Sequence, residues 1–311
     1  MQQRPLGVRG PAVSVVGLGC NNFGMALDEP EARAVVAAAL DAGITHFDTA
    51  EGYGGGRSEV MLGSALGAHR DEVVIATKAL RRSEAVTWRP GDLARRIEEG
   101  CTTSLRRLRT DRIDVYYEHH RDPDAPVEEA LGALDHLVQE GKVRVAACSN
   151  YAADDIRHAA AAWEAAGWAP LGAVQLHWNL LVRQAEDDVV PAAHAASLGI
   201  VPYYPLASGL LTGKYRPDSP FPAGSRFDRL PRFSTVATAD NFAAVNRLSA
   251  VADTMGHSVG ELAIAWLAAQ PGVASVIVGA TTPEQVRANA HAAEWVLDAD
   301  ELAAVDDAAP R

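Results

Sequence analysis

Four side chains of complementary chemistry follow short apolar segments that are typical of β-strands. Asp48 and Tyr53 lie five residues apart just after one such segment, Lys78 follows the next, and His119 follows the one after. A carboxylate, a phenol, an ammonium and an imidazole at the ends of successive strands can form a site that donates a proton. The chain must then bring these strand ends together.

The chemistry of such a site can be written from the residue types. A tyrosine in water has a pKa of about 10 and is a poor acid at neutral pH. We expect the Lys78 ammonium to lower the pKa of Tyr53, Asp48 to hold Lys78 in place, and His119 to bond the substrate oxygen. Such a site protonates an alkoxide as it forms from a carbonyl, which is worth roughly 10²–10⁴-fold in rate. No side chain donates hydride, so a nicotinamide or similar cofactor is required.

Eight short apolar segments alternate with longer amphipathic ones. The candidate strands span residues 13–19, 44–48, 73–77, 113–118, 143–148, 173–177, 200–204 and 275–278. This alternation predicts a parallel sheet with right-handed crossovers, and eight units suggest a closed (β/α)₈ TIM barrel. Catalytic groups in a barrel come from the C-terminal ends of its strands, so the polar residues that close these segments face one mouth.

The main structural alternative is an open, doubly wound sheet. A nucleotide-binding fold of that kind has a Gly-x-Gly-x-x-Gly turn at the start of its first helix. Here Gly17 and Gly19 fit the first two positions, but the next glycine, Gly24, does not fit the third. We therefore predict the barrel, as a single domain over residues 1–311. The longest irregular stretch, residues 207–239, follows strand seven and lies over the mouth of a barrel.

Helix signals agree with the barrel. An apolar stripe at helical spacing runs from Leu93 to Leu108. Ser258 with Glu261, and Thr282 with Gln285, are spaced as capping boxes at helix starts.

Charge and cysteine content restrict the function classes. Lys+Arg 28 against Asp+Glu 40 gives a net charge of −12, which argues against binding to nucleic acid or to an anionic membrane. The N-terminal residues contain no apolar signal segment. Three widely spaced cysteines are typical of reduced thiols, so we expect a cytoplasmic protein.

Four segments in the right order resemble the aldo/keto reductase family over nearly the whole chain. Residues 48–63 are similar to the family's first signature and residues 141–150 to its second. Residues 203–214 and 279–289 resemble its cofactor segments. The resemblance implies a (β/α)₈ TIM barrel with an N-terminal β-hairpin and a long loop after strand seven.

The resemblance also implies a role for each matching residue. The catalytic tetrad is matched by Asp48, Tyr53, Lys78 and His119, with Tyr53 as the acid. The clamp on the nicotinamide carboxamide is matched by Ser149, Asn150 and Gln175, and Tyr203 matches the aromatic that stacks on the ring. The loop over the pyrophosphate is matched by Leu206, Ser208, Gly209, Leu211 and Lys214. The adenosine end is matched by Gly279, Thr281, Gln285 and Asn289.

The implied cofactor is NADP(H), which most of the family uses. A 2′-phosphate is usually bound by Lys or Arg, yet the positions around Gly279 and Thr281 and at Gln285 carry no basic residue. Arg287 is close in sequence and equally fits a solvent-facing helix position. NAD(H) therefore stays an alternative.

Several residues near the strand ends have two interpretations. Asn21 and Trp88 are candidate substrate contacts, or a turn residue and a packing aromatic. His119 and His120 lack further ligands at metal-binding spacing, so we predict no metal. Glu118 departs from the family pattern: it is either a rim carboxylate paired with an arginine, or it enters the site if the register shifts by one residue. Trp178 and Tyr204 could line the substrate pocket or pack in the core.

The predicted function is reduction of an aldehyde, ketone or sugar carbonyl, with the small-molecule carbonyl as the partner. The alternative is a cofactor-binding sensor or partner protein with little turnover, and a metal-dependent barrel hydrolase is a distant third. The full tetrad favours the enzyme. The loops after the strands carry no obvious charge clamp, so the particular carbonyl stays open, as does the oligomeric state.

Overall fold

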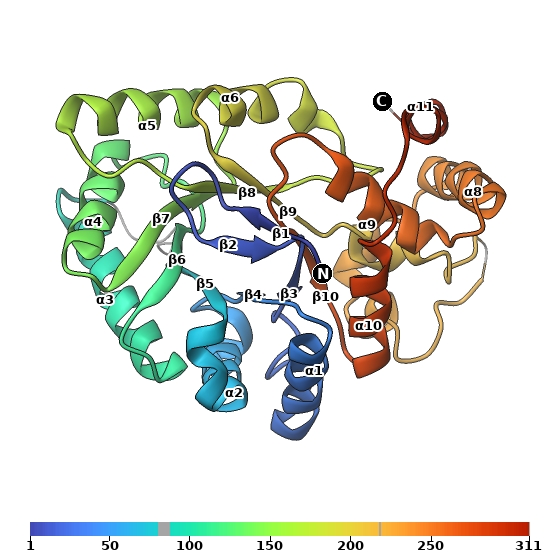
Figure 1. Ribbon diagram of the computed structural model, residues 1–311, viewed down its shortest axis with the longest axis horizontal. Helices are drawn as coiled ribbons and strands as arrows, with labels where there is room; N and C mark the ends of the chain where they lie inside the picture. The colour runs from blue at the N-terminus through green and yellow to red at the C-terminus, as the bar shows by residue number, and fades with distance from the viewer. Residues whose placement is uncertain (80–87, 218, 311) are drawn as a thin grey trace.

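The computed structural model describes residues 1–79, 88–217 and 219–310, and within them eight parallel strands close into a barrel (Figure 1). The strands are β3 (Val16–Gly19), β4 (His46–Asp48), β5 (Val74–Ala79), β6 (Ile113–Glu118), β7 (Val143–Ser149), β8 (Ala173–His177), β9 (Gly199–Tyr203) and β10 (Val276–Gly279). They follow one another around the barrel in chain order, and β10 pairs with β3 to close it. The predicted TIM barrel is confirmed.

An antiparallel hairpin of β1 (Gln3–Pro5) and β2 (Ala12–Ser14) crosses the N-terminal end of the barrel (Figure 1). Leu6 and Val13 are fully buried and join the apolar cluster that fills the barrel interior. The turn must approach the strands closely, because a Cβ at Gly7 would lie 2.2 Å from the Gly172 carbonyl oxygen. The hairpin therefore plugs this end, and the opposite end carries the polar residues.

The first predicted strand is divided in the structure. The chain leaves the hairpin at Ser14 and enters the barrel at Val16. The Ser14 hydroxyl accepts the Thr45 and His46 amides at 2.9 and 3.2 Å and donates to the Val16 carbonyl at 2.6 Å. The Ser14 side chain replaces backbone hydrogen-bond partners where the chain changes direction, and one apolar segment therefore forms two strands.

Helices surround the barrel as a ring (Figure 1). They are α1 (Glu29–Asp41), α2 (Arg57–Leu66), α3 (Asp92–Leu108), α4 (Val127–Gln139), α5 (Ala153–Ala166), α6 (Val189–Ala195), α9 (Val259–Ala269) and α10 (Pro283–Ala292). Two more, α8 (Ala239–Thr254) and α11 (Ala299–Ala308), pack on each other at one side. Among the described residues, no helix is long and apolar enough to cross a membrane.

The apolar stripes of these helices form the layer of core between helices and barrel. In α3, Leu93, Ile97 and Leu108 are buried as the spacing predicts. Trp178 is also buried there, with its ring edge-on to Trp266 at 5.7 Å between centroids. Trp178 is therefore a packing residue.

One predicted capping box is complete and one is not. Ser258 and Glu261 exchange both bonds at the start of α9. Thr282 accepts the Gln285 amide at 3.3 Å, but the Gln285 side chain turns to Thr281 instead of to the cap. The second box was wrong in this half, because Thr281 offers Gln285 both an amide and a hydroxyl.

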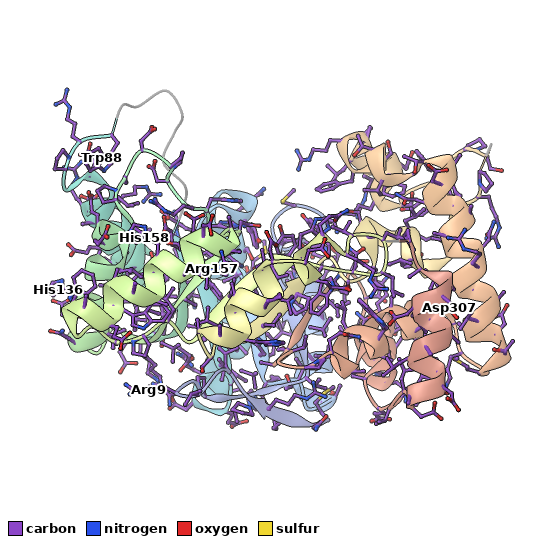
Figure 2. The ribbon with its side chains drawn as sticks, turned by 90° about the horizontal axis from the view of Figure 1, so that it is seen from above. Arg9, Trp88, His136, Arg157, His158 and Asp307 are labelled. Carbon is purple, nitrogen blue, oxygen red and sulfur yellow. The ribbon has the colours of Figure 1, made fainter. Side chains whose placement is uncertain are left out.

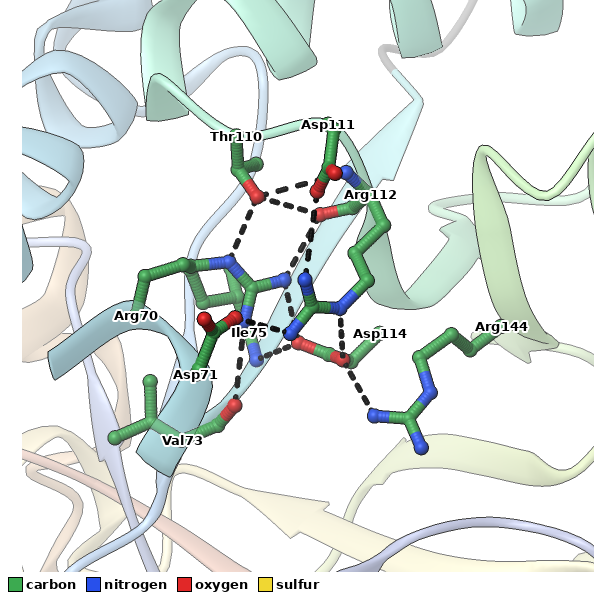
Figure 3. Close-up of polar contacts among 9 residues, drawn as sticks. All are labelled: Arg70, Asp71, Val73, Ile75, Thr110, Asp111, Arg112, Asp114 and Arg144. Carbon is green, nitrogen blue, oxygen red and sulfur yellow. Dashed lines mark hydrogen bonds and ion pairs between the residues drawn. The ribbon is translucent and has the colours of Figure 1, made fainter.

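A buried carboxylate joins β5, β6 and β7 near the hairpin end of the barrel (Figure 3). Asp114 accepts the Ile75 amide at 2.9 Å and pairs with Arg70 at 2.8 Å and Arg144 at 3.0 Å. Arg112 lies 3.8 Å from the same carboxylate. The cluster satisfies a charge that could not otherwise be buried.

The long segment after β9 is more regular than its composition predicts. Apart from residue 218, it contains η4 (Ala207–Thr212), α7 (Arg226–Arg229) and η5 (Pro231–Val236). These short helices lie on the side of the C-terminal strand ends, so the segment is available to cover the mouth.

Candidate active site

The four predicted catalytic residues lie at the C-terminal ends of three neighbouring strands. Asp48 ends β4, Lys78 is the last but one residue of β5, and His119 follows β6 directly. Tyr53 begins η1 (Tyr53–Gly56) in the loop after β4. Because parallel strands bring these ends to one edge, the structure places all four at one mouth.

Asp48 and Lys78 form a buried ion pair. The Lys78 Nζ donates to Asp48 Oδ1 and to the Thr49 carbonyl oxygen, both at 2.7 Å. The other oxygen of Asp48 accepts from Gln175 Nε2 at 2.8 Å. The Lys78 side chain is 0% exposed. Three hydrogen bonds therefore hold the ammonium in one place and orient the carboxylate.

The phenol of Tyr53 lies beside this ammonium. Lys78 Nζ is 5.2 Å from the centre of the Tyr53 ring. The expected lowering of the Tyr53 pKa is not observed. Burial raises the pKa well above its ordinary value, Asp48 adds to the rise, and the charge of Arg226 opposes it. Tyr53 is therefore fully protonated at neutral pH and has a proton to give.

The imidazole of His119 is neutral. Burial and the neighbouring charge of Lys78 lower the pKa of His119 to about 2. Its ring meets the Tyr53 ring edge-on at 6.0 Å between centroids and stacks on the His120 ring at 4.6 Å. A neutral ring beside Tyr53 can donate one hydrogen bond to a substrate oxygen without competing as an acid.

The predicted clamp residues lie at the ends of β7 and β8 and bind one another. Asn150 donates to the His119 carbonyl at 2.9 Å and to Ser149 Oγ at 3.1 Å, and it accepts from the Tyr203 hydroxyl at 2.7 Å. Gln175, the third, bonds Asp48 instead. Asn150 has φ 57°, a left-handed conformation that costs about 1–3 kcal/mol unless the surroundings hold it. The site is thus tightly ordered around the Asn150 amide.

Tyr203 presents a flat aromatic surface at the mouth. One face stacks on the His177 ring at 5.3 Å between centroids and 8° between planes, and Tyr204 packs edge-on at 5.2 Å. His177 therefore fixes the plane of the tyrosine, as a platform for a planar ligand requires.

The predicted pyrophosphate loop has an unusual backbone. Ala207, Ser208 and Gly209 have consecutive positive φ values of 45°, 58° and 103°. Leu211 is fully buried, so its side chain anchors the loop in the core. Lys214 is exposed, with Nζ 5.2 Å from the centre of the Tyr215 ring. Leu206, which precedes η4, is partly buried and accepts the Gly209 amide at 2.7 Å.

The predicted adenosine end follows β10. Gly279 closes that strand, and Gln285 Oε1 accepts from the Thr281 amide at 2.8 Å. Asn289 is partly buried on α10. Arg287 is exposed and lies 3.6 Å from Glu284, so this cation sits at the rim rather than inside the site.

The two predicted substrate residues lie apart. Asn21 is beside Gly279, since its Oδ1 would be 3.7 Å from a Cβ there. Trp88 donates its indole N–H to Glu129 of α4 at 3.2 Å, and Figure 2 shows it near the upper edge of the molecule. In the described residues, the contacts of Trp88 are thus with α4 and not with Tyr53; its substrate role stays a prediction.

Glu118 is neither a rim residue nor a site residue. It is buried, with its carboxylate bonded by the Tyr151 hydroxyl and, at 3.3 Å, by the Asp122 amide. The expected arginine partner is replaced by these two donors. The register of β6 sends Tyr117 into the barrel and Glu118 toward the helices, which leaves His119 beside Tyr53.

Two residues of this mouth have no motif that marks them. His177, which supports Tyr203, ends a strand but matched no expected role. Arg226 comes from the long segment after β9, where the sequence indicates no charge clamp. Its guanidinium lies over the Tyr204 and Phe233 rings at 5.3 and 4.5 Å, and its charge acts on Tyr53. Only the packing of that segment brings Arg226 to the site.

A cavity of about 430 Å³ opens next to the predicted catalytic residues. It is lined by His120, Arg121, Pro123, Asn150 and Asp155. Two of these residues contact His119 directly, His120 by ring stacking and Asn150 by a hydrogen bond. A small molecule in this cavity would lie against the edge that carries His119 and would meet mostly polar groups.

The fold and the site define a TIM-barrel protein that has a buried ion pair beside a protonated tyrosine at one mouth. A model of the aldo/keto reductase family matches residues 15–310. The chain is 34% identical over 313 residues to the aldo-keto reductase YhdN of Bacillus subtilis (strain 168), covering 97% of this chain and 91% of that protein. It is 38% identical over 311 residues to a probable voltage-gated potassium channel subunit beta of Oryza sativa subsp. japonica, covering 95% and 92%. The chain belongs to the aldo/keto reductase family.

Proposed function

We propose that this protein is a cytoplasmic, single-domain, NADP(H)-dependent reductase of an aldehyde, ketone or sugar carbonyl. The observation that carries the proposal is the joint placement of four groups: the buried Asp48–Lys78 pair, the protonated Tyr53 and the neutral His119. The phenol keeps its proton and the imidazole is neutral, as carbonyl reduction needs at neutral pH.

The residues of the mouth suit a nicotinamide coenzyme. Amide and hydroxyl groups of Ser149, Asn150 and Gln175 gather at adjacent strand ends, as a carboxamide clamp requires. Tyr203 offers a flat face, and Lys214 supplies a cation at the end of the positive-φ loop. When bound, the coenzyme supplies the hydride that no side chain can.

The protein's own part is to hold the carbonyl and deliver a proton. His119 donates a hydrogen bond to the carbonyl oxygen, which fixes its position next to Tyr53. Tyr53 gives its hydroxyl proton to that oxygen as negative charge develops on it. Lys78 stabilises the phenolate that remains, because an ammonium favours the charged form of a neighbouring acid. Asp48 keeps Lys78 within reach throughout.

Coenzyme preference rests on the 2′-phosphate. Arg287 and Lys214 are both exposed and able to reach an anionic ligand at the rim, which supports NADP(H). The neutral positions Thr281 and Gln285 bond each other, which favours NAD(H) as the alternative. The test is a titration of protein fluorescence with NADPH and with NADH. NADPH is expected to bind at least about tenfold more tightly, a difference of about 1.4 kcal/mol.

A carbonyl screen with the tighter coenzyme then tests the activity. Consumption of the coenzyme with at least one aldehyde, ketone or sugar is expected. Since the cavity beside His119 is mostly polar, small oxygen-rich carbonyls should be better substrates than long apolar ones. Absence of coenzyme consumption across such a panel would contradict the proposed reaction.

The second candidate is a coenzyme-binding partner protein with little turnover. It is supported by the relatives named as probable potassium channel subunits beta, at 38% identity in Oryza sativa subsp. japonica and 35% in Arabidopsis thaliana. NADPH binding without consumption in the same screen favours this candidate. The tetrad, with a protonated Tyr53 beside the buried ion pair, favours the reductase.

A further inference from the structure

A closed ring of bonds ties the end of β6 to the end of β7. The His119 carbonyl accepts from Asn150 Nδ2 at 2.9 Å. Asn150 is followed by Tyr151, whose hydroxyl donates to Glu118, and Glu118 is covalently joined to His119. The Asp122 amide donates to the other carboxylate oxygen at 3.3 Å. Glu118 therefore anchors both the loop that carries His119 and the loop that carries Asn150.

The ring connects two residues with different tasks in the proposed function. His119 faces Tyr53, and Asn150 bonds Ser149 and Tyr203 at the expected coenzyme clamp. We propose that Glu118 is a positioning residue, whose buried carboxyl group sets the location of His119 relative to Asn150. The catalytic consequence of this inference rests on the proposed function, but the positioning of the two loops does not depend on it.

The charged surroundings of Glu118 make the ring sensitive to pH. Burial raises the pKa of Glu118 to about 7, while Tyr151, Arg121 and the Asp122 amide lower it and the Asp122 carboxylate raises it. From β7 and α5 the thiol of Cys148 and the carboxylate of Asp155 also face this region. Above pH 7 the ionised carboxyl accepts both bonds, and hydrogen bonds to a charged acceptor are roughly twice as strong, although ionising this buried group lowers the stability of the fold as a whole.

Three variants separate positioning from general stability. Glu118→Leu keeps the approximate volume and loses both bonds, whereas Glu118→Gln can still accept the Asp122 amide and bond Tyr151. Tyr151→Phe removes the hydroxyl alone and serves if the leucine variant does not fold. The matched control is Tyr116→Phe, because Tyr116 is also buried on β6 and loses one hydrogen bond, to the Ile97 carbonyl at 3.1 Å, away from the site.

The first readout needs no turnover: amide hydrogen exchange at residues 119–122 and 150–151. Exchange there should rise about tenfold in Glu118→Leu and Tyr151→Phe and stay unchanged in Glu118→Gln and Tyr116→Phe, because local opening tracks lost contacts. Unchanged exchange in both Glu118→Leu and Tyr151→Phe would overturn the proposal, whatever the protein's activity.

The second readout is the dissociation constant for NADPH and kcat/KM at pH 6 and pH 8. In Glu118→Leu the dissociation constant should rise about tenfold and kcat/KM should fall about tenfold, which corresponds to about 1.4 kcal/mol. In Glu118→Gln both quantities should stay within about twofold of wild type at pH 6. The ratio of kcat/KM in wild type to kcat/KM in Glu118→Gln should change between pH 6 and pH 8. Taking this ratio removes the effect of other groups that titrate in both proteins. Equal losses in Tyr116→Phe would overturn positioning, and a ratio that is constant with pH would overturn the sensitivity of the ring to pH. Wild-type protein that binds neither coenzyme would refute the proposed function instead and leave the exchange result to decide for Glu118.

Discussion

Removing one partner of the Asp48–Lys78 pair should destabilise the fold more than removing both. The pair is 2.7 Å long, and the two side chains are 4% and 0% exposed. Lys78→Met leaves Asp48 buried with Gln175 as its remaining side-chain donor. Asp48→Asn leaves the Lys78 ammonium without a carboxylate.

The magnitude follows from desolvation. An uncompensated charge in a dry environment costs about 3–5 kcal/mol, whereas loss of both charges is often nearly neutral. For a chain of this size each kcal/mol lowers the melting temperature by roughly 2 °C. Each single variant should therefore melt roughly 5–10 °C below wild type. The double variant should recover at least half of the larger loss.

The assay is thermal unfolding followed by circular dichroism on four proteins in parallel. A matched surface control is Lys142→Met, because Lys142 pairs with Glu140 at 2.9 Å with both side chains about 40% exposed. An exposed pair of this kind contributes about 0–1 kcal/mol, so the control should melt within roughly 2 °C of wild type. Additive losses in the double variant, or single losses no larger than that of the control, would refute the reasoning.

Three further predictions concern stability. Glu118→Gln should stabilise the protein above pH 7 but not at pH 4. The pKa of Glu118 is about 7 in the folded protein against an ordinary value of 4.5, so wild type loses stability as the pH rises between these two values. The loss is on the order of 3 kcal/mol in total. Melting curves of both proteins from pH 4 to 8 check this, and parallel curves would refute it. Asp114→Asn should cost about 3 kcal/mol in urea unfolding, because it leaves buried arginine charge unpaired, whereas Arg144→Ala on the half-exposed side of the cluster should cost less than about 1 kcal/mol. Gly63→Ala should cost about 2 kcal/mol or more by the same measurement, since a Cβ there would lie 2.4 Å from the Leu108 carbonyl oxygen; an unchanged midpoint would show that α2 and α3 can separate.

Much of the fold could be predicted because its signals are local. The spacing of the apolar segments predicts the strands and the order of elements, and β6 and β8 have the predicted bounds. The division at Ser14 could not be predicted, because it depends on the Thr45 and His46 amides some thirty residues away.

The candidate site divides in the same way. The residue types of Asp48, Tyr53 and Lys78 predict a meeting at one mouth, and the barrel brings them together. The direction of the Tyr53 pKa shift could not be predicted, because it depends on how burial compares with one ammonium. Arg226 was missed for a similar reason: its position depends on the packing of a long segment without periodicity.

Glu118 shows why a departure from a family pattern needs the structure. From the sequence it could lie on the rim or enter the site. The outward direction of its side chain is fixed by β6, in which Tyr117 fills the barrel interior. Its partner Tyr151 lies 33 residues away, on the next strand's loop.

The replacement of Tyr53 by phenylalanine tests the proposed chemistry most directly. Phenylalanine keeps the ring beside Lys78 and removes the only group assigned to donate the proton. The measurement is NADPH consumption with the best carbonyl substrate, together with the dissociation constant for NADPH. The proposed mechanism predicts a rate at least about 10²-fold lower, as for loss of a general acid, with the dissociation constant within about threefold of wild type. Turnover that is unchanged in Tyr53→Phe would contradict it.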